Sequence, residues 1–211
     1  MFTVERRTYR LTGITPILGS NPADPAIHTK FVSAKAPSEW QQTEEDGMLP
    51  ADADKGVTVF LRAPNGSGEA LCLREHMILG FFKSAAGALK AQVGLVQHKS
   101  KIDQYLFCRP TNLLLTRDGV PIIEEDSVLE RPLRAQTMQG PRVALASSEQ
   151  VDDPWEITME LTLVPNEGSA KSRALSWETI ETCLDYGALN GLGQWRNGGY
   201  GRFTWERVSE Q

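Results

Sequence analysis

The residues best suited to ligand chemistry lie near the C-terminal end of the chain, in segment 191–203. Five glycines are interleaved there with two arginines, Arg196 and Arg202, and with two aromatic residues, Trp195 and Tyr200. Because glycine lacks a Cβ and adopts positive φ, such a loop can bring backbone N–H groups close to an anion. Arginine pairs with phosphate, and flat rings stack on bases. The segment therefore predicts contact with a phosphate-bearing polymer.

Two other interpretations of these glycines must be considered. A dinucleotide-binding site requires the order strand, glycine loop, helix. Here a helix comes first, over 176–190, with Ser176 as its N-cap, and a strand over 200–208 comes last. This order argues against a dinucleotide site. The second interpretation stays open: the glycines only cap the helix and form a long turn, and the arginines are solvated.

Composition favours a single domain over 1–211. The 211 residues are 40% hydrophobic, which suffices for one substantial core. No run of eighteen apolar residues exists, and the first residues lack the apolar stretch of a signal peptide, so we expect no membrane segment and a cytoplasmic location. Three scattered cysteines fit a reducing compartment and buried packing positions, namely Cys72, Cys108 and Cys183.

Charge is distributed unevenly along the chain. The net charge of −5 does not advertise a nucleic-acid-binding protein. However, segment 39–54 holds six acidic residues and no basic one, whereas Arg131, Arg134 and Arg142 fall in a stretch without acids after Glu130. A basic face on an acidic protein is therefore possible.

Periodicity predicts an α+β chain. A strong helix is expected over 73–92, in addition to the one over 176–190. Strands are expected over 8–17, 57–62, 69–72, 105–116, 120–123, 142–147, 155–164 and 200–208. Residues 57–62 and 69–72 should pair as a hairpin around a turn of Pro, Asn and Gly. A long irregular acidic insertion is expected over about 21–56.

The glycine segment also carries a family resemblance. Residues 191–193 and 199–203 resemble the signature loop of the repeat-associated mysterious protein (RAMP) superfamily, which includes the RNA-binding backbone subunits of CRISPR complexes and guide-processing endoribonucleases. Residues 9–20 look like the first strand and turn of those proteins, and 62–66 with 78–83 look like their hairpin and helix. The resemblance implies a ferredoxin-like (RRM-like) core with long insertions and a glycine-rich loop between the last helix and the last strand.

A second resemblance is narrower. Residues 131–148 and 189–198 look like an uncharacterised family of bacteriophage and prophage proteins. That likeness carries no activity, but it implies a virus-encoded relative of the CRISPR subunits in the cytoplasm of a bacterial host.

The RAMP resemblance implies that the chain binds single-stranded RNA or DNA without catalysis, cofactor or metal. The expected contacts in the loop are Gly193, Trp195, Arg196, Gly198, Gly199, Tyr200 and Arg202. Further expected contacts are Lys83, Lys99, Lys101, Arg134 and Arg142. Outside the loop, a solvated surface position is the open alternative for each basic residue.

Three alternative functions remain open from the sequence. An endoribonuclease would use His28 and Asp24, which match only the approximate position of catalytic groups in relatives. A protein-interaction factor could mimic or disrupt a CRISPR complex through a phage or host protein partner. Self-assembly into an oligomer or filament would use the insertions as contacts between subunits.

Overall fold

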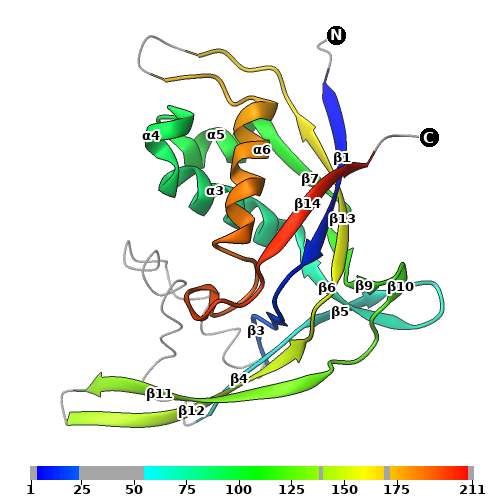
Figure 1. The fold of residues 1–211 in the computed structure, drawn as a ribbon, viewed down its shortest axis with the longest axis vertical. Helices are drawn as coiled ribbons and strands as arrows, with labels where there is room; N and C mark the ends of the chain where they lie inside the picture. Colours follow the sequence, from blue (N-terminus) through cyan, green and yellow to red (C-terminus); the bar gives the residue numbers. More distant parts are fainter. Residues whose placement is uncertain (1–3, 24–54, 138–139, 169–171, 209–211) are drawn as a thin grey trace.

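The computed structural model describes residues 4–23, 55–137, 140–168 and 172–208, with 55–56 and 133–145 described as backbone only. Within these residues the chain is a mixed α+β protein with many strands and four α-helices, as Figure 1 shows. Most of the predicted acidic insertion lies outside the described residues. The catalytic alternatives Asp24 and His28 lie outside them as well.

Four antiparallel strands form the centre of the largest sheet, which we call the four-stranded sheet. In spatial order they are β7 (Leu106–Arg109), β13 (Glu156–Leu163), β1 (Glu5–Gly13) and β14 (Phe203–Val208). Two short strands, β9 (Thr116–Arg117) and β10 (Val120–Pro121), continue this sheet beyond the start of β13. The predicted strands 8–17, 155–164 and 200–208 are thereby confirmed as β1, β13 and β14, within a few residues.

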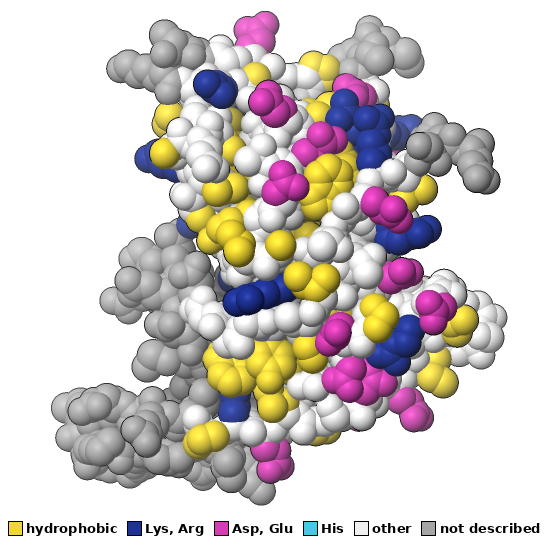
Figure 2. Space-filling view, viewed as in Figure 1, with side chains coloured by type: hydrophobic (Ala, Val, Ile, Leu, Met, Phe, Trp, Pro, Cys, Tyr) yellow, Lys and Arg dark blue, Asp and Glu magenta, His cyan; other side chains and the backbone are white. Residues whose placement is uncertain are grey.

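Strict alternation explains why one face of this sheet is buried. Along β13, Ile157, Met159 and Leu161 are fully buried, whereas the residues between them are more exposed. Helices α3 (Glu75–Ala88) and α6 (Trp177–Asp185) cover the buried face. The opposite face carries charged and threonine side chains of β1, β13 and β14. Figure 2 shows acidic and basic residues interspersed over the visible face of the molecule.

The helices differ in part from the sequence-based expectation. The predicted helix 73–92 is divided into α3 and a short α4 (Lys90–Val93). Helix α5 (His98–Tyr105) was not predicted, because its sequence is polar and only Ile102 is buried. Ser176 caps α6 as expected: its Oγ accepts a hydrogen bond from the Thr179 N–H at 3.3 Å.

A second sheet contains a long hairpin that extends away from the helices (Figure 1). Its strands are β11 (Ser127–Thr137), β12 (Gly140–Val151), β4 (Lys55–Val59), β3 (Asn21–Pro22) and β2 (Ile17–Leu18). Strand β11 was missed in the sequence, because Pro132 interrupts the segment and Arg131 takes a place in its apolar phase. The predicted strand 142–147 is only the middle of β12.

A third, small sheet contains β5 (Leu61–Pro64), β6 (Glu69–Arg74) and β8 (Asn112–Leu114). Strands β5 and β6 pair antiparallel, so the predicted hairpin is confirmed in part. The predicted strand 57–62 divides, because 57–59 belong to β4 of the second sheet and only 61–62 belong to β5. The single strand expected over 105–116 is wrong, because Tyr105 ends α5 and the rest divides into β7, β8 and the start of β9.

Candidate nucleic-acid interface

Residues 191–202, here called the glycine loop, connect the helical layer to β14. The short 3₁₀ helix η1 (Tyr186–Ala188) precedes the loop, and η2 (Arg196–Gly198) lies within it. The loop closes on itself through a hydrogen bond from Leu192 N–H to the Gly201 carbonyl, 2.9 Å long. Gly201 N–H in turn donates to the Pro16 carbonyl at 2.7 Å, so the loop is fixed to the chain that follows β1.

Close approach within the chain explains most of the glycines. At Gly201, φ is +69°, and a Cβ would overlap the carbonyl of Leu192. A Cβ at Gly198 would lie 2.6 Å from the indole of Trp195. Gly199 differs: φ is +89°, yet the nearest atom to a Cβ would be a guanidinium nitrogen of Arg202 at 3.6 Å. Internal packing therefore accounts for Gly198 and Gly201 without any ligand.

Three side chains form a stack where the loop meets the hairpin. The rings of Trp195 and Tyr200 lie parallel within 19°, with centroids 5.1 Å apart. The guanidinium carbon of Arg131 lies 4.5 Å from the indole centroid. The stack therefore joins strand β11 to the glycine loop. With Tyr200 and Arg131 both packed on its ring, Trp195 offers a base less stacking surface than the sequence suggested.

Arg131 is the most unusual residue of this stack. Its side chain extends from β11, where it faces Ala146 of β12, and only 6% of its surface is exposed. Its Nε and Nη1 are buried without a hydrogen-bond partner. Burial lowers the pKa of its guanidinium, while Tyr200 acts in the opposite direction. Arginine nevertheless stays protonated in proteins, so this buried positive charge keeps two N–H groups without an acceptor among the described residues.

A polar cluster fastens the other side of the loop to the second sheet. Thr58 of β4 and Ser148 of β12 are neighbours in the parallel register and are both buried. The Gln194 Oε1 accepts hydrogen bonds from the hydroxyls of Thr58 at 2.6 Å and Ser148 at 3.2 Å. This cluster satisfies itself, because the two hydroxyls are also 2.8 Å from each other.

Arg202 is the second loop arginine with an unsatisfied group. Its backbone N–H donates to the Thr15 Oγ1 at 2.9 Å, and its carbonyl accepts from the Ile14 N–H at 2.8 Å. Its Nε is buried without a partner. Arg196, in η2, is half-buried. The junction of glycine loop and hairpin, referred to below as the junction, thus holds Arg131 against the Trp195–Tyr200 pair, and the loop also contributes Arg202.

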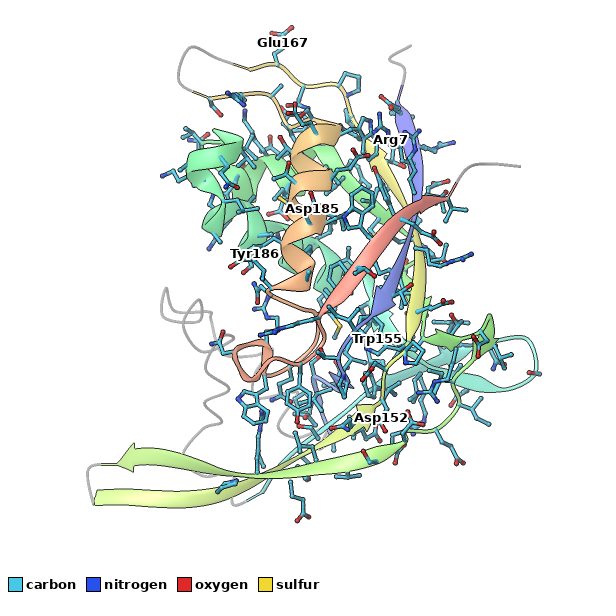
Figure 3. The ribbon with its side chains drawn as sticks, viewed as in Figure 1. Arg7, Asp152, Trp155, Glu167, Asp185 and Tyr186 are labelled. Atoms are coloured by element: carbon cyan, nitrogen blue, oxygen red, sulfur yellow. The ribbon has the colours of Figure 1, made fainter. Side chains whose placement is uncertain are left out.

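Trp155 holds the two sheets together beside this junction, as Figure 3 shows. Its ring is fully buried, and its Nε1–H donates to the Thr15 carbonyl at 2.9 Å. A Cβ at Gly13 would overlap the Trp155 indole, so β1 ends in a glycine for a packing reason. Trp155 therefore fixes the segment around Thr15, which in turn binds the backbone of Arg202.

The three lysines predicted to contact nucleic acid belong to the helical layer. Lys83 of α3 pairs with Asp103 of α5 at 2.6 Å. Lys101 donates to the Ser172 Oγ at 3.0 Å and to the Arg173 carbonyl at 2.6 Å, and Lys99 is exposed on α5. Figure 1 shows α5 well separated from the glycine loop. These lysines do not join the cluster at the junction.

Arg134 and Arg142 have described backbones only. They occupy adjacent register positions in the hairpin, where Arg134 pairs with Val143 and Ala135 with Arg142. Their side chains lie outside the described part of the chain, and so do Asp24 and His28.

The outer face of the four-stranded sheet is a different kind of surface. Its arginines have carboxylate neighbours: Arg10 lies 3.2 Å from Glu206, and Arg6 lies 3.9 Å from Glu160. Threonines occupy many of the positions between them, and Phe107 is the aromatic residue exposed there, on β7. Arg109 of β7 is also exposed there, so the face mixes ion-paired and other basic residues, and its described residues form no row of stacking rings.

The cysteines, the potential metal ligands and the helices bear on further expectations from the sequence. The three cysteines are buried, and burial raises the pKa of Cys108 and Cys183 to about 12, as expected for packing thiols. No cluster of His, Cys, Asp or Glu suited to a metal occurs in the described parts. None of the described helices has the length and apolar character needed to span a membrane.

Comparison with known proteins shows a similar fold but no family. No family model matches the sequence, and no curated protein does. Among solved structures, the chain is similar to a chain of the "Type IV-B CRISPR Complex", with a TM-score of 0.51 and 10% sequence identity. The similarity covers 97% of this chain and 91% of that one. At this identity the likeness concerns the fold, and it is consistent with the predicted RAMP-like fold.

Sequence reasoning missed four residues of the junction: Arg131 as a site residue, Gln194, Thr58 and Ser148. A signal for Arg131 existed, because it lies between Leu129 and Leu133 in the apolar phase of the strand. A charged residue at a position that the alternation predicts to be buried is rare unless it is paired with another group. For Thr58 and Ser148 no such signal existed, because they lie far apart in the sequence and meet only when β4 pairs with β12.

Proposed function

We propose that this chain binds single-stranded nucleic acid, RNA or DNA, without cleaving it. The binding surface is the junction of the glycine loop and the β11–β12 hairpin. One observation carries the proposal: Arg131 and Arg202 hold buried N–H groups without acceptors, beside two stacked aromatic rings. Phosphate oxygens are acceptors that guanidinium groups bind strongly, often through two parallel hydrogen bonds.

The fold supports this function. We propose that the strands β7-β13-β1-β14 form a ferredoxin-like core; the position of α3 to α5 between β1 and β7, and of α6 between β13 and β14, supports this assignment. We propose on this basis that the chain is a RAMP-like protein, and its structural neighbour in a CRISPR complex supports that assignment. The glycine loop then occupies the position between last helix and last strand that the resemblance implies. The bacteriophage relationship stays a prediction from the sequence.

Fluorescence anisotropy with labelled single-stranded RNA and DNA, over a salt series, tests the proposal. The variant Arg196→Ala/Arg202→Ala should bind about 10-fold or more weakly, and its salt slope should fall by about 1.4, at ~0.7 per lost phosphate contact. The matched control is Arg6→Ala/Arg10→Ala, which removes the same charge from the outer sheet face. It should bind as the wild type does.

Absence of binding to either polymer at low salt would contradict the proposal and favour a protein partner. Equal weakening in both double variants would show that net charge, not the loop, governs binding. Gel analysis of the same oligonucleotides tests the endoribonuclease alternative: we expect intact strands, and cleavage that disappears in His28→Ala or Asp24→Ala would establish a nuclease.

Assembly with other chains is a second candidate, favoured by the neighbour's membership of a complex. The long hairpin and its outer strand β11 offer an edge for another chain. Light scattering tests it directly, because a monomer has a mass of 23.4 kDa. A mass several-fold larger, with or without bound nucleic acid, is the outcome expected of an assembling subunit.

A further inference from the structure

We propose that Arg131 is the phosphate receptor of this interface, and that Trp195 positions Arg131 instead of stacking a base. The inference rests on the proposed function and assigns a residue outside the glycine loop to the binding site. It means that the β11–β12 hairpin and the glycine loop bind the same single strand of nucleic acid.

The first argument is the burial of an unsatisfied charge. Arg131 is 6% exposed, and its Nε and Nη1 have no acceptor. Leaving buried donors unsatisfied is costly, more so when the group is charged. Such a group calls for a specific explanation, and a bound ligand that supplies the missing acceptor is one.

The second argument compares Arg131 with the ion-paired arginines. Within the described residues, Arg6, Arg7, Arg10, Arg62 and Arg117 each lie within 4.0 Å of a carboxylate. Arg131 has no such neighbour among the described residues. Nor does the adjacent polar cluster serve it, because Gln194 Oε1 already accepts from Thr58 and Ser148.

The third argument is orientation. The guanidinium of Arg131 packs over the indole of Trp195, with its central carbon 4.5 Å from the ring centroid. Tyr200 supports the indole from its own stacked position, 5.1 Å away. The stack therefore holds Arg131 in one orientation before any ligand arrives, which lowers the entropy cost of binding.

Two substitutions of Arg131 separate its charge from its shape. Arg131→Met keeps the chain length without the charge, and should weaken binding of a labelled single strand at least 10-fold while lowering the salt slope by about 0.7. Arg131→Lys keeps the charge but not the planar guanidinium that forms two parallel hydrogen bonds. The salt slope of its binding should therefore match the wild type, while its affinity falls about 5-fold or more. Arg10→Met, on the outer sheet face, is the matched control and should change neither quantity.

The salt slope distinguishes a phosphate contact from a purely structural role. If Arg131→Met binds more weakly but keeps the wild-type slope, Arg131 only shapes the junction and the inference is overturned. If Arg131→Met does not fold, Arg131→Lys becomes the deciding variant. An affinity equal to that of the wild type would then reject bidentate binding of phosphate by the Arg131 guanidinium. Wild-type protein that binds no strand at all would reject the proposed function first. Wild-type binding with a fully active Arg131→Met would reject this inference alone.

Discussion

The outer face of the four-stranded sheet and the junction of glycine loop and hairpin both present arginines, but in opposite states. On the sheet face, Arg10 has Glu206 and Arg6 has Glu160 as neighbours, and the side chains remain largely in water. At the junction, Arg131 is buried against Trp195, and neither it nor Arg202 has an acceptor at Nε. The difference teaches that arginine content is a poor guide to a binding site. Unsatisfied arginine is a better one.

Exposed ion pairs such as those on the sheet face contribute little to stability and little to recognition. A buried cation without an anion is different, because desolvation strengthens its attraction for any acceptor that can reach it. In a protein of net charge −5, this distinction also explains how an anionic polymer could be bound at all.

The largest expected effect on stability concerns two glycines of the glycine loop. Gly201→Ala combines a positive φ with an overlap at the Leu192 carbonyl, and should lower the free energy of unfolding by about 3 kcal/mol or more. Gly199→Ala has a positive φ but no overlap, and should cost only about 1–2 kcal/mol. Urea unfolding of both variants measures the difference. Equal losses would mean that close packing does not define the loop.

A smaller effect compares two threonines, one from each region. Thr58→Val removes a buried hydroxyl that serves Gln194 and Ser148, and should destabilise the protein by about 1–2 kcal/mol. Thr158→Val changes an exposed residue of the four-stranded sheet, and should alter stability by less than about 0.5 kcal/mol. Thermal unfolding of the two variants is the measurement. A neutral Thr58→Val would show that the loop is not fastened through this cluster.

The smallest effect concerns a carboxylate-paired arginine. Asp126 accepts hydrogen bonds from Arg117 at 3.2 and 2.7 Å, and this contact holds the pKa of Asp126 below its ordinary value of 3.8. A lowered folded-state pKa stabilises the protein above that ordinary value, and the contribution is lost as pH falls through the folded-state pKa. Asp126→Asn should therefore cost about 0.5–1 kcal/mol at pH 7 and less below about pH 4.

Urea unfolding at several pH values checks this expectation, with Glu206→Gln as the control on the outer sheet face. Because the Arg10–Glu206 pair is more exposed, its loss should change stability by less than about 0.5 kcal/mol. A pH-independent deficit in Asp126→Asn would mean that the carboxylate's charge is not what matters there.

Much of the fold could be predicted from the sequence, because alternation and helical spacing are local. The alternation of Ile157, Met159 and Leu161 identified β13, and the cap at Ser176 identified the start of α6. Strand β11 and helix α5 could not be identified, since their stability comes from partners: β11 pairs with β12 along its full length, and α5 packs on α3. Local pattern is weak where tertiary contacts supply the energy.

The candidate site divides in the same way. The glycine loop and its aromatic residues were visible in the sequence, but the glycines' role was not, because a close approach such as Gly201 to Leu192 exists only after folding. The lysines of the helical layer lie away from the loop, and their role stays a prediction: basic residues are recognisable in a sequence, whereas their distance from one another is not.

The sequence by itself determined several strands, the start of α6 and the chemistry available to the glycine loop, because these depend on neighbouring residues. Only the tertiary structure decided which arginines keep unsatisfied N–H groups. It brings Arg131 of β11 onto Trp195 in a loop 64 residues further along the chain, and it gives the arginines of the sheet face their carboxylates. Burial and pairing are properties of the packed chain, and they separate a charged residue that binds from one that is merely solvated.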